Sequence, residues 1–582
     1  MLSQRSTPVK MSQEAASKLP RWSLIGLLVV FAFAGLWNGD FWTTRDAESF
    51  ATAMSMLNGT GVETLLPIIV DSPITAHGPL TAWVSALFIS LFGESGALSL
   101  MSDVTATHLA AAFWFAGTTV ALWYGTWYLA RRQEAQPIAF AFGGEASPRD
   151  YSRVVADSTV LLFVATFGIV TRQHEAISDT ALLTMTALNF YGLSSALRRP
   201  IVGMFVAGFA AGAALLASTV FAGFWLLVGS LLVTSLVNTY PSVRPKRLTA
   251  LLTGTVSGFI IWPLLAFAFY PAEAASWFSL WATDQASLFG LTTADTYLWF
   301  TKNAVWYLCP IWPFVLWGLY TWRRHLRLKL THLYVPFILV VTGLFATIFS
   351  SHQAADTVFL TFLPPMAVLA AFGLVTVRRD QENVLDWFSI SIFTLGLLTL
   401  WAYWFAWLTA FAPKMAKSVQ MLAPGSTPSF DSGLVLAVVT SILWLVFVGW
   451  RLTHRPVVAW RGPWLCALGM TATVASSIGL YHTGITHNRS YEPIVAAVAD
   501  VLVERGHTAD DIVCGSGIPP AVQGLFLHYG DIRIETHRQP EDCRFTIHRD
   551  RNGQIYHDGM VGPAVSRPHT DESFTVTESP GL

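Results

Sequence analysis

Residues 201–238 read IVGMFVAGFAAGAALLASTVFAGFWLLVGSLLVTSLVN, a stretch without a single Asp, Glu, Lys or Arg. It contains two apolar runs, 201–217 and 219–238, and each is close to the roughly 20 residues that a helix needs to cross a bilayer. These runs and others like them predict about thirteen transmembrane helices, and a shorter run at 80–92 is interpreted as a helix at the membrane interface. The other runs are 22–38, 104–130, 154–171, 177–197, 249–270, 304–322, 332–349, 355–376, 386–409, 433–450 and 463–481.

The composition agrees with a membrane protein. Of 582 residues, 53% are hydrophobic and 12% are charged, whereas a soluble domain carries about 25% charged residues. The 35 basic and 36 acidic residues nearly balance, which gives no reason to expect nucleic-acid binding. Four Cys without a Cys-x-x-Cys pair exclude zinc ribbons and thioredoxin chemistry. The predicted fold class is an all-α polytopic membrane protein with a small α/β domain.

Lys and Arg are unevenly distributed between the two sets of loops that these spans define. One set carries them in every loop, whereas the other set carries only Arg45, Arg172, Lys302, Lys414 and Lys417. Cytoplasmic loops are enriched in Lys and Arg. We therefore expect a multi-pass protein of the cytoplasmic (inner) membrane, with residues 1–21 in the cytoplasm and the C-terminus outside it.

Three parts of the chain follow from this topology. Residues 1–21 are the cytoplasmic N-terminus, and residues 22–482 are the transmembrane domain, whose first extracytoplasmic loop covers 39–103. From 483 the apolar runs stop and short segments alternate like half-buried strands. Residues 483–582 are therefore expected to form a small extracytoplasmic α/β domain with a loose tail after about 560. Its Cys514 and Cys543 form either a disulfide, which that compartment permits, or two buried thiols.

Ionisable side chains gather at the predicted outer ends of the spans. Such residues are costly near a membrane and are functional candidates for that reason. Each also has a simpler explanation: Asp46 and Asp179 suit helix N-caps, His174 and His352 suit solvated turns, and Asp284 suits an ordinary loop. The candidates are Arg45, Asp46, Glu48, Arg172, His174, Glu175, Asp179, Asp284 and His352.

Residues 41–94 carry a resemblance to a known family. Asp46, Phe50-Ala51, the turn His77-Gly78-Pro79-Leu80 with Trp83, and Leu91-Phe92-Gly93-Glu94 follow one another along this stretch. The pattern resembles the first outer loop of GT-C glycosyltransferases of the aminoarabinose transferase and protein O-mannosyltransferase group. Residues 350–374, which include Leu363-Pro364-Pro365-Met366, are similar to a second segment of that family. The chain departs from the family's metal-binding and neighbouring residues at four positions, which carry Ala47, Ala76, His77 and Gln285.

The resemblance implies an integral membrane glycosyltransferase. Such an enzyme moves a hexose or pentose from a polyprenyl-phosphate carrier to lipid A, a glycan or a protein on the outer face of the membrane, with inversion. It implies Asp46 as the catalytic base, and no cofactor is certain, although a divalent cation is possible with Asp46, Glu48 and Asp284 as candidate ligands. The implied substrate-binding residues are Arg45, Glu48, His77, Arg172, His174, Glu175, Asp179 and His352.

Three alternatives stay open at this stage. An O-antigen ligase or polymerase also works on carrier lipids at the outer face. A carrier-lipid transporter or flippase would place charged groups near the bilayer midplane, whereas the acids here lie at one face. A scaffold with a decayed site would account for Ala47, Ala76 and Gln285.

Overall fold

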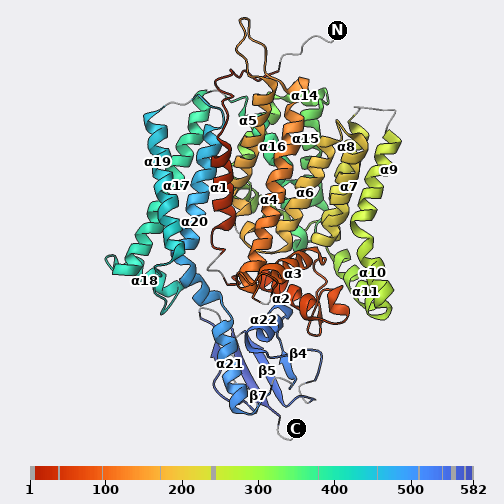
Figure 1. The fold of residues 1–582 in the computed structure, drawn as a ribbon, viewed down its shortest axis with the longest axis vertical. Coiled ribbons are helices and arrows are strands. Elements are labelled where there is room, and N and C mark those ends of the chain that lie inside the picture. Colours follow the sequence, from red (N-terminus) through yellow and green to blue (C-terminus); the bar gives the residue numbers. More distant parts are fainter. Residues whose placement is uncertain are drawn as a thin grey trace.

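A computed structural model describes residues 7–36, 40–94, 96–170, 172–237, 244–377, 379–454, 457–508, 511–539, 542–551, 557, 559–568 and 572–579. Within these residues the chain forms a bundle of long helices and, at one end of it, a smaller domain of helices and strands (Figure 1). The bundle contains α1 (Arg21–Phe33), α4 (Asp103–Ala130), α5 (Pro148–Val164), α6 (Ser178–Ser195), α7 (Pro200–Ala217), α8 (Val220–Leu236), α9 (Arg244–Phe259), α13 (Ile311–Thr321), α15 (Thr331–Ala346), α16 (Ala355–Leu374), α17 (Arg379–Thr409), α19 (Ser432–Thr453) and α20 (Arg461–Arg489).

Shorter helices connect the bundle elements. Two of them, α10 and α11, follow α9 at the end of the bundle that carries the small domain (Figure 1). Their bounds and those of the other connecting helices are α10 (Ile261–Phe269), α11 (Pro271–Ser287), α12 (Ala294–Tyr307), α14 (Arg323–Arg327) and α18 (Pro413–Leu422), with 3-10 turns η1 (Val62–Thr64), η2 (Gln133–Ala135), η3 (Phe167–Ile169), η4 (Arg172–His174), η6 (Thr347–Phe349) and η7 (His352–Ala354).

The fold class is confirmed. Among the described residues, 7 helical segments are long and apolar enough to cross a membrane, or up to 9 if two bent helix pairs each count as one span. The predicted number of thirteen stays a prediction, because some bundle helices do not meet those criteria. For example, α1 and α8 contain 13 and 17 residues.

The apolar runs 201–217 and 219–238 correspond to α7 and α8. On α7, Gly208 and Gly212 lie against α9, where Gly254 and Gly258 repeat the same four-residue spacing. A Cβ added to Gly208 would lie 1.9 Å from the Leu251 carbonyl oxygen. Small residues at this spacing let two membrane helices approach closely and pack by van der Waals contact, so glycine is required where α7 and α9 meet.

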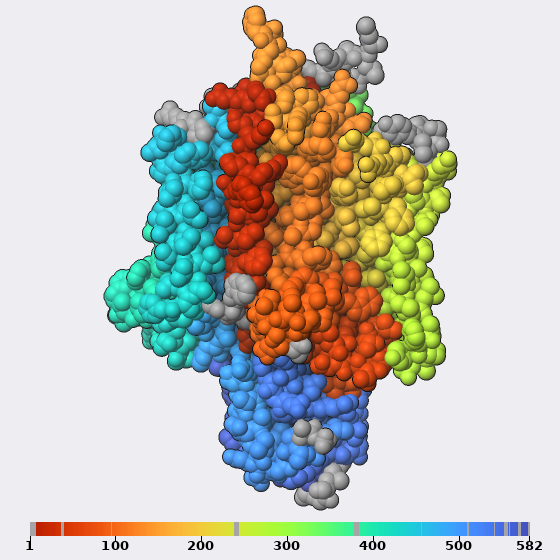
Figure 2. All heavy atoms as spheres, in the orientation of Figure 1, coloured from red at the N-terminus to blue at the C-terminus, as the bar shows by residue number. Residues whose placement is uncertain are grey.

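The loop between α1 and α4, predicted to be the first outer loop, forms a layer below the bundle. It contains α2 (Thr44–Asn58), the two-stranded hairpin of β1 (Ile68–Ile69) and β2 (Ser72–Pro73), and α3 (Leu80–Phe92). The predicted helix at 80–92 is therefore present with the same bounds, and its interfacial position stays a prediction. In the space-filling view this segment, coloured orange-red, lies between the bundle and the blue C-terminal domain (Figure 2).

The C-terminal domain is built from two helices and one mixed sheet. Helix α20 leads out of the bundle into α21 (Glu492–Glu504) and α22 (Pro520–Gly530). The sheet has the order β4-β3-β5-β7-β6, in which β3 is parallel to β4 and β5, and β7 is antiparallel to β5 and β6. The strands are β3 (Val513–Ser516), β4 (Ile534–Glu535), β5 (Phe545–Asp550), β6 (Val565–Ser566) and β7 (Ser573–Glu578).

Two expectations about this domain are resolved. A disulfide joins Cys514 and Cys543, so the alternative of two free thiols is wrong. The loose tail predicted after about 560 is wrong for residues 573–578, because β7 pairs with β5 along six positions. Phe574 and Val576 of β7 are buried, and this burial stabilises the strand. The polar residues around them explain why the sequence did not predict it.

Candidate active site

Asp46 lies at the centre of the candidate site. Thr43 caps α2, since its Oγ1 accepts a hydrogen bond from the Asp46 backbone N–H, so the cap role considered for Asp46 is wrong. Asp46 is 1% exposed. Its Oδ2 lies 2.8 Å from His108 Nε2, and its Oδ1 accepts a hydrogen bond of 3.0 Å from the Ala176 backbone N–H. The carboxylate is therefore fixed between α2, α4 and the segment that precedes α6.

Glu175 is a second acid in the same cluster. Its Oε2 accepts a hydrogen bond of 3.0 Å from Thr43 Oγ1. Burial, and after it the nearby Asp46 carboxylate, raise the pKa of Glu175 from 4.5 to about 7, because both effects disfavour a second negative charge in a site with little water. Glu175 therefore exchanges a proton near neutral pH.

Two arginines meet at one aspartate beside these acids. Asp179 Oδ2 accepts hydrogen bonds from Arg45 Nη2 at 3.0 Å and from Arg172 Nε at 2.9 Å. Arg172 also pairs with Asp356 at 3.4 Å and lies over the ring of Tyr307. Asp179 is 2% exposed and belongs to the first turn of α6, where Ile177 is the cap residue. The cap role considered for Asp179 is therefore wrong.

A cavity of about 480 Å³ adjoins this cluster. Its lining includes the polar side chains of Asp40, Asp46, His108 and Glu175, and most of its other lining residues are apolar. Much of the apolar wall comes from the end of α1, from the residues just after it, and from one face of α20. The lining residues there include Ala32, Ala34, Leu36, Met470, Val474 and Ile478.

Two histidines among the predicted site residues make other contacts. The two ring nitrogens of His174 face the carbonyl oxygens of Val170 and Phe31 at 2.6 and 2.7 Å, so this imidazole joins α1 to η4. His352 is exposed and contacts Thr296 Oγ1 at 3.3 Å. Asp356, on the following helical turn, contacts Arg172 of the cluster, and the role predicted for His352 stays a prediction.

His77 and Glu48 occupy half-buried positions with altered proton affinities. Burial lowers the pKa of His77 to about 4, with smaller effects of Asp179 and Arg45. Its imidazole is thus neutral at physiological pH and contributes no positive charge toward a phosphate. Burial also raises the pKa of Glu48, although Arg45 opposes this shift.

The residues expected for a divalent cation do not fit such a site. Among the described residues, no three His, Cys, Asp or Glu side chains are grouped so that they could hold a metal ion. Asp284 accepts a hydrogen bond from Thr75 Oγ1. Gln285 donates to the carbonyl oxygens of Thr75 and Ala76, and it accepts from the Val220 N–H at 2.9 Å. These two side chains fasten the first outer loop to α11, and we derive no chemical step through a metal.

Sequence reasoning missed two residues that touch the cluster. His108 lies near the start of α4 and Asp40 lies before α2; Asp40 accepts a hydrogen bond from Tyr529 of α22. His108 carried a usable signal, because an ionisable residue within an apolar run is a functional candidate. Asp40 carried none, since its partner is 489 positions away in the sequence.

Comparisons with known proteins indicate the fold. No family model matches the chain, and no curated protein matches it in sequence. The solved structure of ArnT from Cupriavidus metallidurans bound to undecaprenyl phosphate matches with a TM-score of 0.65 and 14% identity, over 96% of this chain and 98% of that chain. The apo state of the same protein matches with a TM-score of 0.62 and 14% identity, over 95% and 97%. The chain therefore has the GT-C fold of a multi-pass membrane protein.

Proposed function

We propose that this protein is a membrane glycosyltransferase that transfers a sugar from a polyprenyl-phosphate carrier to an acceptor hydroxyl. The observation that carries the proposal is the cavity of about 480 Å³, whose lining combines Asp46, His108 and Glu175 with mainly apolar residues. A lipid-linked sugar likewise combines a polar head with an apolar chain. The ArnT structure of the same fold is bound to undecaprenyl phosphate, which supports a carrier of this chemical class.

Asp46 is the proposed base. The acceptor hydroxyl loses its proton as its oxygen attacks the anomeric carbon, and a carboxylate within hydrogen-bond reach takes that proton. Each oxygen of Asp46 accepts one hydrogen bond from the protein, from Ala176 N–H or from His108. A carboxylate offers about four lone-pair sites, so each oxygen keeps one for the acceptor while the protein contacts hold its orientation.

Arg45 and Arg172 are the proposed contacts of the carrier phosphate. Each guanidinium donates one hydrogen bond to Asp179 Oδ2, and Arg172 also contacts Asp356 and the Gly168 carbonyl oxygen. A guanidinium has five N–H donors, so both arginines keep donors for a phosphate. Charge-assisted Arg–phosphate hydrogen bonds are short and strong. They would stabilise the phosphate as the bond between it and the anomeric carbon breaks and the polyprenyl phosphate leaves.

We further propose the finer assignments that the resemblance implied. One displacement at the anomeric carbon inverts its configuration, and the acceptor is an envelope lipid, glycan or protein. The site opens on the outer face of the cytoplasmic membrane, because the loops on the side of α14 carry most of the Lys and Arg residues. Glu48 and Glu175 orient the acceptor through hydrogen bonds.

The test is transfer by purified Asp46→Asn protein. A panel of undecaprenyl-phosphate-linked hexoses and pentoses serves as donor, and release of undecaprenyl phosphate is measured with the envelope fraction as acceptor. Loss of a general base lowers rates by about 10²–10⁴-fold, so we expect at least a hundredfold loss. The matched control is Asp295→Asn, an exposed carboxylate on α12, which should keep wild-type rates.

Two outcomes would contradict the proposal. Asp46→Asn protein that transfers within twofold of wild type excludes Asp46 as the base. Wild-type protein that moves the intact lipid-linked sugar across vesicles without releasing the carrier supports a flippase instead.

A further inference from the structure

We propose that the cleft between α2, the β1–β2 turn and α22 binds the carbohydrate part of the acceptor, as a neutral or amino oligosaccharide. The cleft has a volume of about 440 Å³ and lies between the first outer loop and the C-terminal domain. The inference rests on the proposed function, because it names the chemical class of acceptor that the site at Asp46 would use.

Polar side chains that make no hydrogen bond with the protein line the cleft. Among the residues that the structure describes, these are Asn58, Glu63, His528 and Asp531, although the His528 ring also packs against Phe50 and Tyr529. Carboxylate oxygens accept hydrogen bonds, and an amide both donates and accepts. Neighbouring sugar hydroxyls both donate and accept, so these groups match a carbohydrate.

The remaining surface of the cleft favours a ligand with an apolar face and no negative charge. Met54, Ile69 and Leu527 provide apolar wall, and a sugar ring presents C–H groups to such a surface. The one lining arginine, Arg533, already pairs with Glu535 at 3.4 Å. With Glu63 and Asp531 also present, a phosphate or carboxylate ligand would be repelled.

Two residues that line the cleft have positive φ angles. Val70 and Asp531 both line it, with φ of 56° and 51°. A β-branched residue with positive φ is uncommon and costs free energy, and such residues cluster at binding sites. Asp531 ends α22 in the left-handed conformation that a helix C-cap uses.

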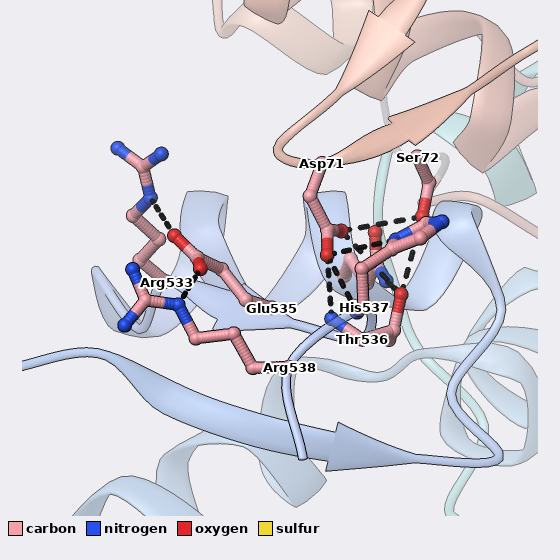
Figure 3. A network of polar contacts seen from close by, with 8 residues as sticks. Asp71, Ser72, Arg533, Glu535, Thr536, His537 and Arg538 are labelled. Carbon is pink, nitrogen blue, oxygen red and sulfur yellow. Dashed lines mark hydrogen bonds and ion pairs between the residues drawn. The ribbon is translucent and has the colours of Figure 1, made fainter. Parts of the chain in front are cut away.

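The two walls of the cleft are joined by a polar contact next to Val70 (Figure 3). Asp71 Oδ2 accepts hydrogen bonds from the backbone N–H groups of Thr536 and His537 at 2.7 and 2.9 Å, and it faces His537 Nδ1 at 3.0 Å. Burial alone would raise the pKa of Asp71, but the contacts with His537 and Thr536 lower it. The ionised carboxylate therefore holds the hairpin against the C-terminal domain.

The position of the cleft relative to Asp46 sets the size of the acceptor. The helix α2 supplies both Asp46 and the cleft residues from Ala51 to Asn58. At a rise of 1.5 Å per residue, these residues lie about 8 to 18 Å farther along the helix axis than Asp46. A single sugar in the cleft does not span that distance, so the acceptor that fits is an oligosaccharide.

The experiment measures binding without catalysis. Purified full-length protein is titrated with maltotetraose, mannotetraose and chitotetraose, and binding is followed by saturation-transfer NMR. We expect at least one of them to bind, and we expect the Kd to rise at least tenfold in the double variant Asn58→Ala/Glu63→Gln, because two hydrogen bonds are lost. Asp531→Asn is a second variant that preserves the left-handed backbone, and Asp500→Asn, an exposed carboxylate on α21, is the control that should bind like wild type.

The outcomes separate this inference from the proposed function. No binding to wild type, or equal affinity in wild type and both cleft variants, would overturn the cleft assignment. Binding to Asp46→Asn protein with unchanged Kd would support a site distinct from the base. Carbohydrate binding by a wild-type protein that never releases undecaprenyl phosphate would overturn the glycosyltransferase proposal and leave the cleft assignment standing.

Discussion

Glu175 shows how one side chain depends on its surroundings. It lies between Thr43, which donates a hydrogen bond, and Asp46, whose charge opposes its ionisation. Its pKa of about 7, against 4.5 ordinarily, means that the folded chain binds this proton more tightly than the unfolded chain does. The stability that results is complete below about pH 4.5 and is lost as the pH rises through about 7.

We therefore predict that Glu175→Gln changes the pH dependence of unfolding. A shift from 4.5 to about 7 corresponds to about 3 kcal/mol, so wild type should lose up to that much stability, relative to Glu175→Gln, between pH 4.5 and 8. Chemical unfolding in detergent across this range is the measurement. Glu504→Gln, at an exposed position of α21, should follow wild type, and parallel curves for wild type and Glu175→Gln would refute the raised pKa.

At the scale of elements, α2 connects the two candidate sites. Its first turn carries Arg45 and Asp46, and its later turns pack on α22 of the C-terminal domain. The approach is close: a Cβ added to Gly524 would lie 2.1 Å from the Ala51 Cβ. The C-terminal domain therefore supports the helix that presents the proposed base.

We predict that Gly524→Val separates α2 from α22. Overpacking of this kind costs about 1–3 kcal/mol, and thermal unfolding should show a lower midpoint together with faster proteolysis of residues 59–76. Gly449→Val is the matched control, because no atom lies within 4 Å of a Cβ at that helical glycine. An unchanged midpoint for Gly524→Val would show that the contact between the two helices is loose.

At the scale of the whole molecule, α14 and the C-terminal domain lie at opposite ends of the bundle (Figure 1). From the distribution of Lys and Arg, we expect the basic loops at 131–132, 323–329 and 451–461 on the cytoplasmic side. The cavity, the cleft and the disulfide would then all lie on the other side, where a disulfide is stable.

Cysteine labelling in intact cells tests this orientation. In a Cys309→Ser background, a membrane-impermeant maleimide should label Asp500→Cys and leave Arg327→Cys unlabelled until the cells are opened. Both positions are exposed, so accessibility within the protein does not decide the result. The reverse pattern would place the proposed base in the cytoplasm and exclude transfer on the outer face.

Sequence and structure differ in what each reveals about the site. Asp46, Arg45, Arg172, Glu175 and Asp179 were candidates from their places beside apolar runs, and the structure brings them together. His352 was a candidate for the same reason, and in the structure it is exposed on η7 with its ring facing Thr296. Position along the chain indicates which end of a span a residue occupies, but it does not indicate the direction of its side chain.

The sequence by itself determined the membrane class and the helical fold, since the length and polarity of apolar runs follow directly from the energy of burying a helix in lipid. It also determined which loops differ in charge. Only the tertiary structure decided that His108 meets Asp46, that β7 belongs to the sheet, and that α2 and α22 enclose a cleft. These features depend on contacts between residues far apart in the chain, and no local pattern of residues encodes such contacts.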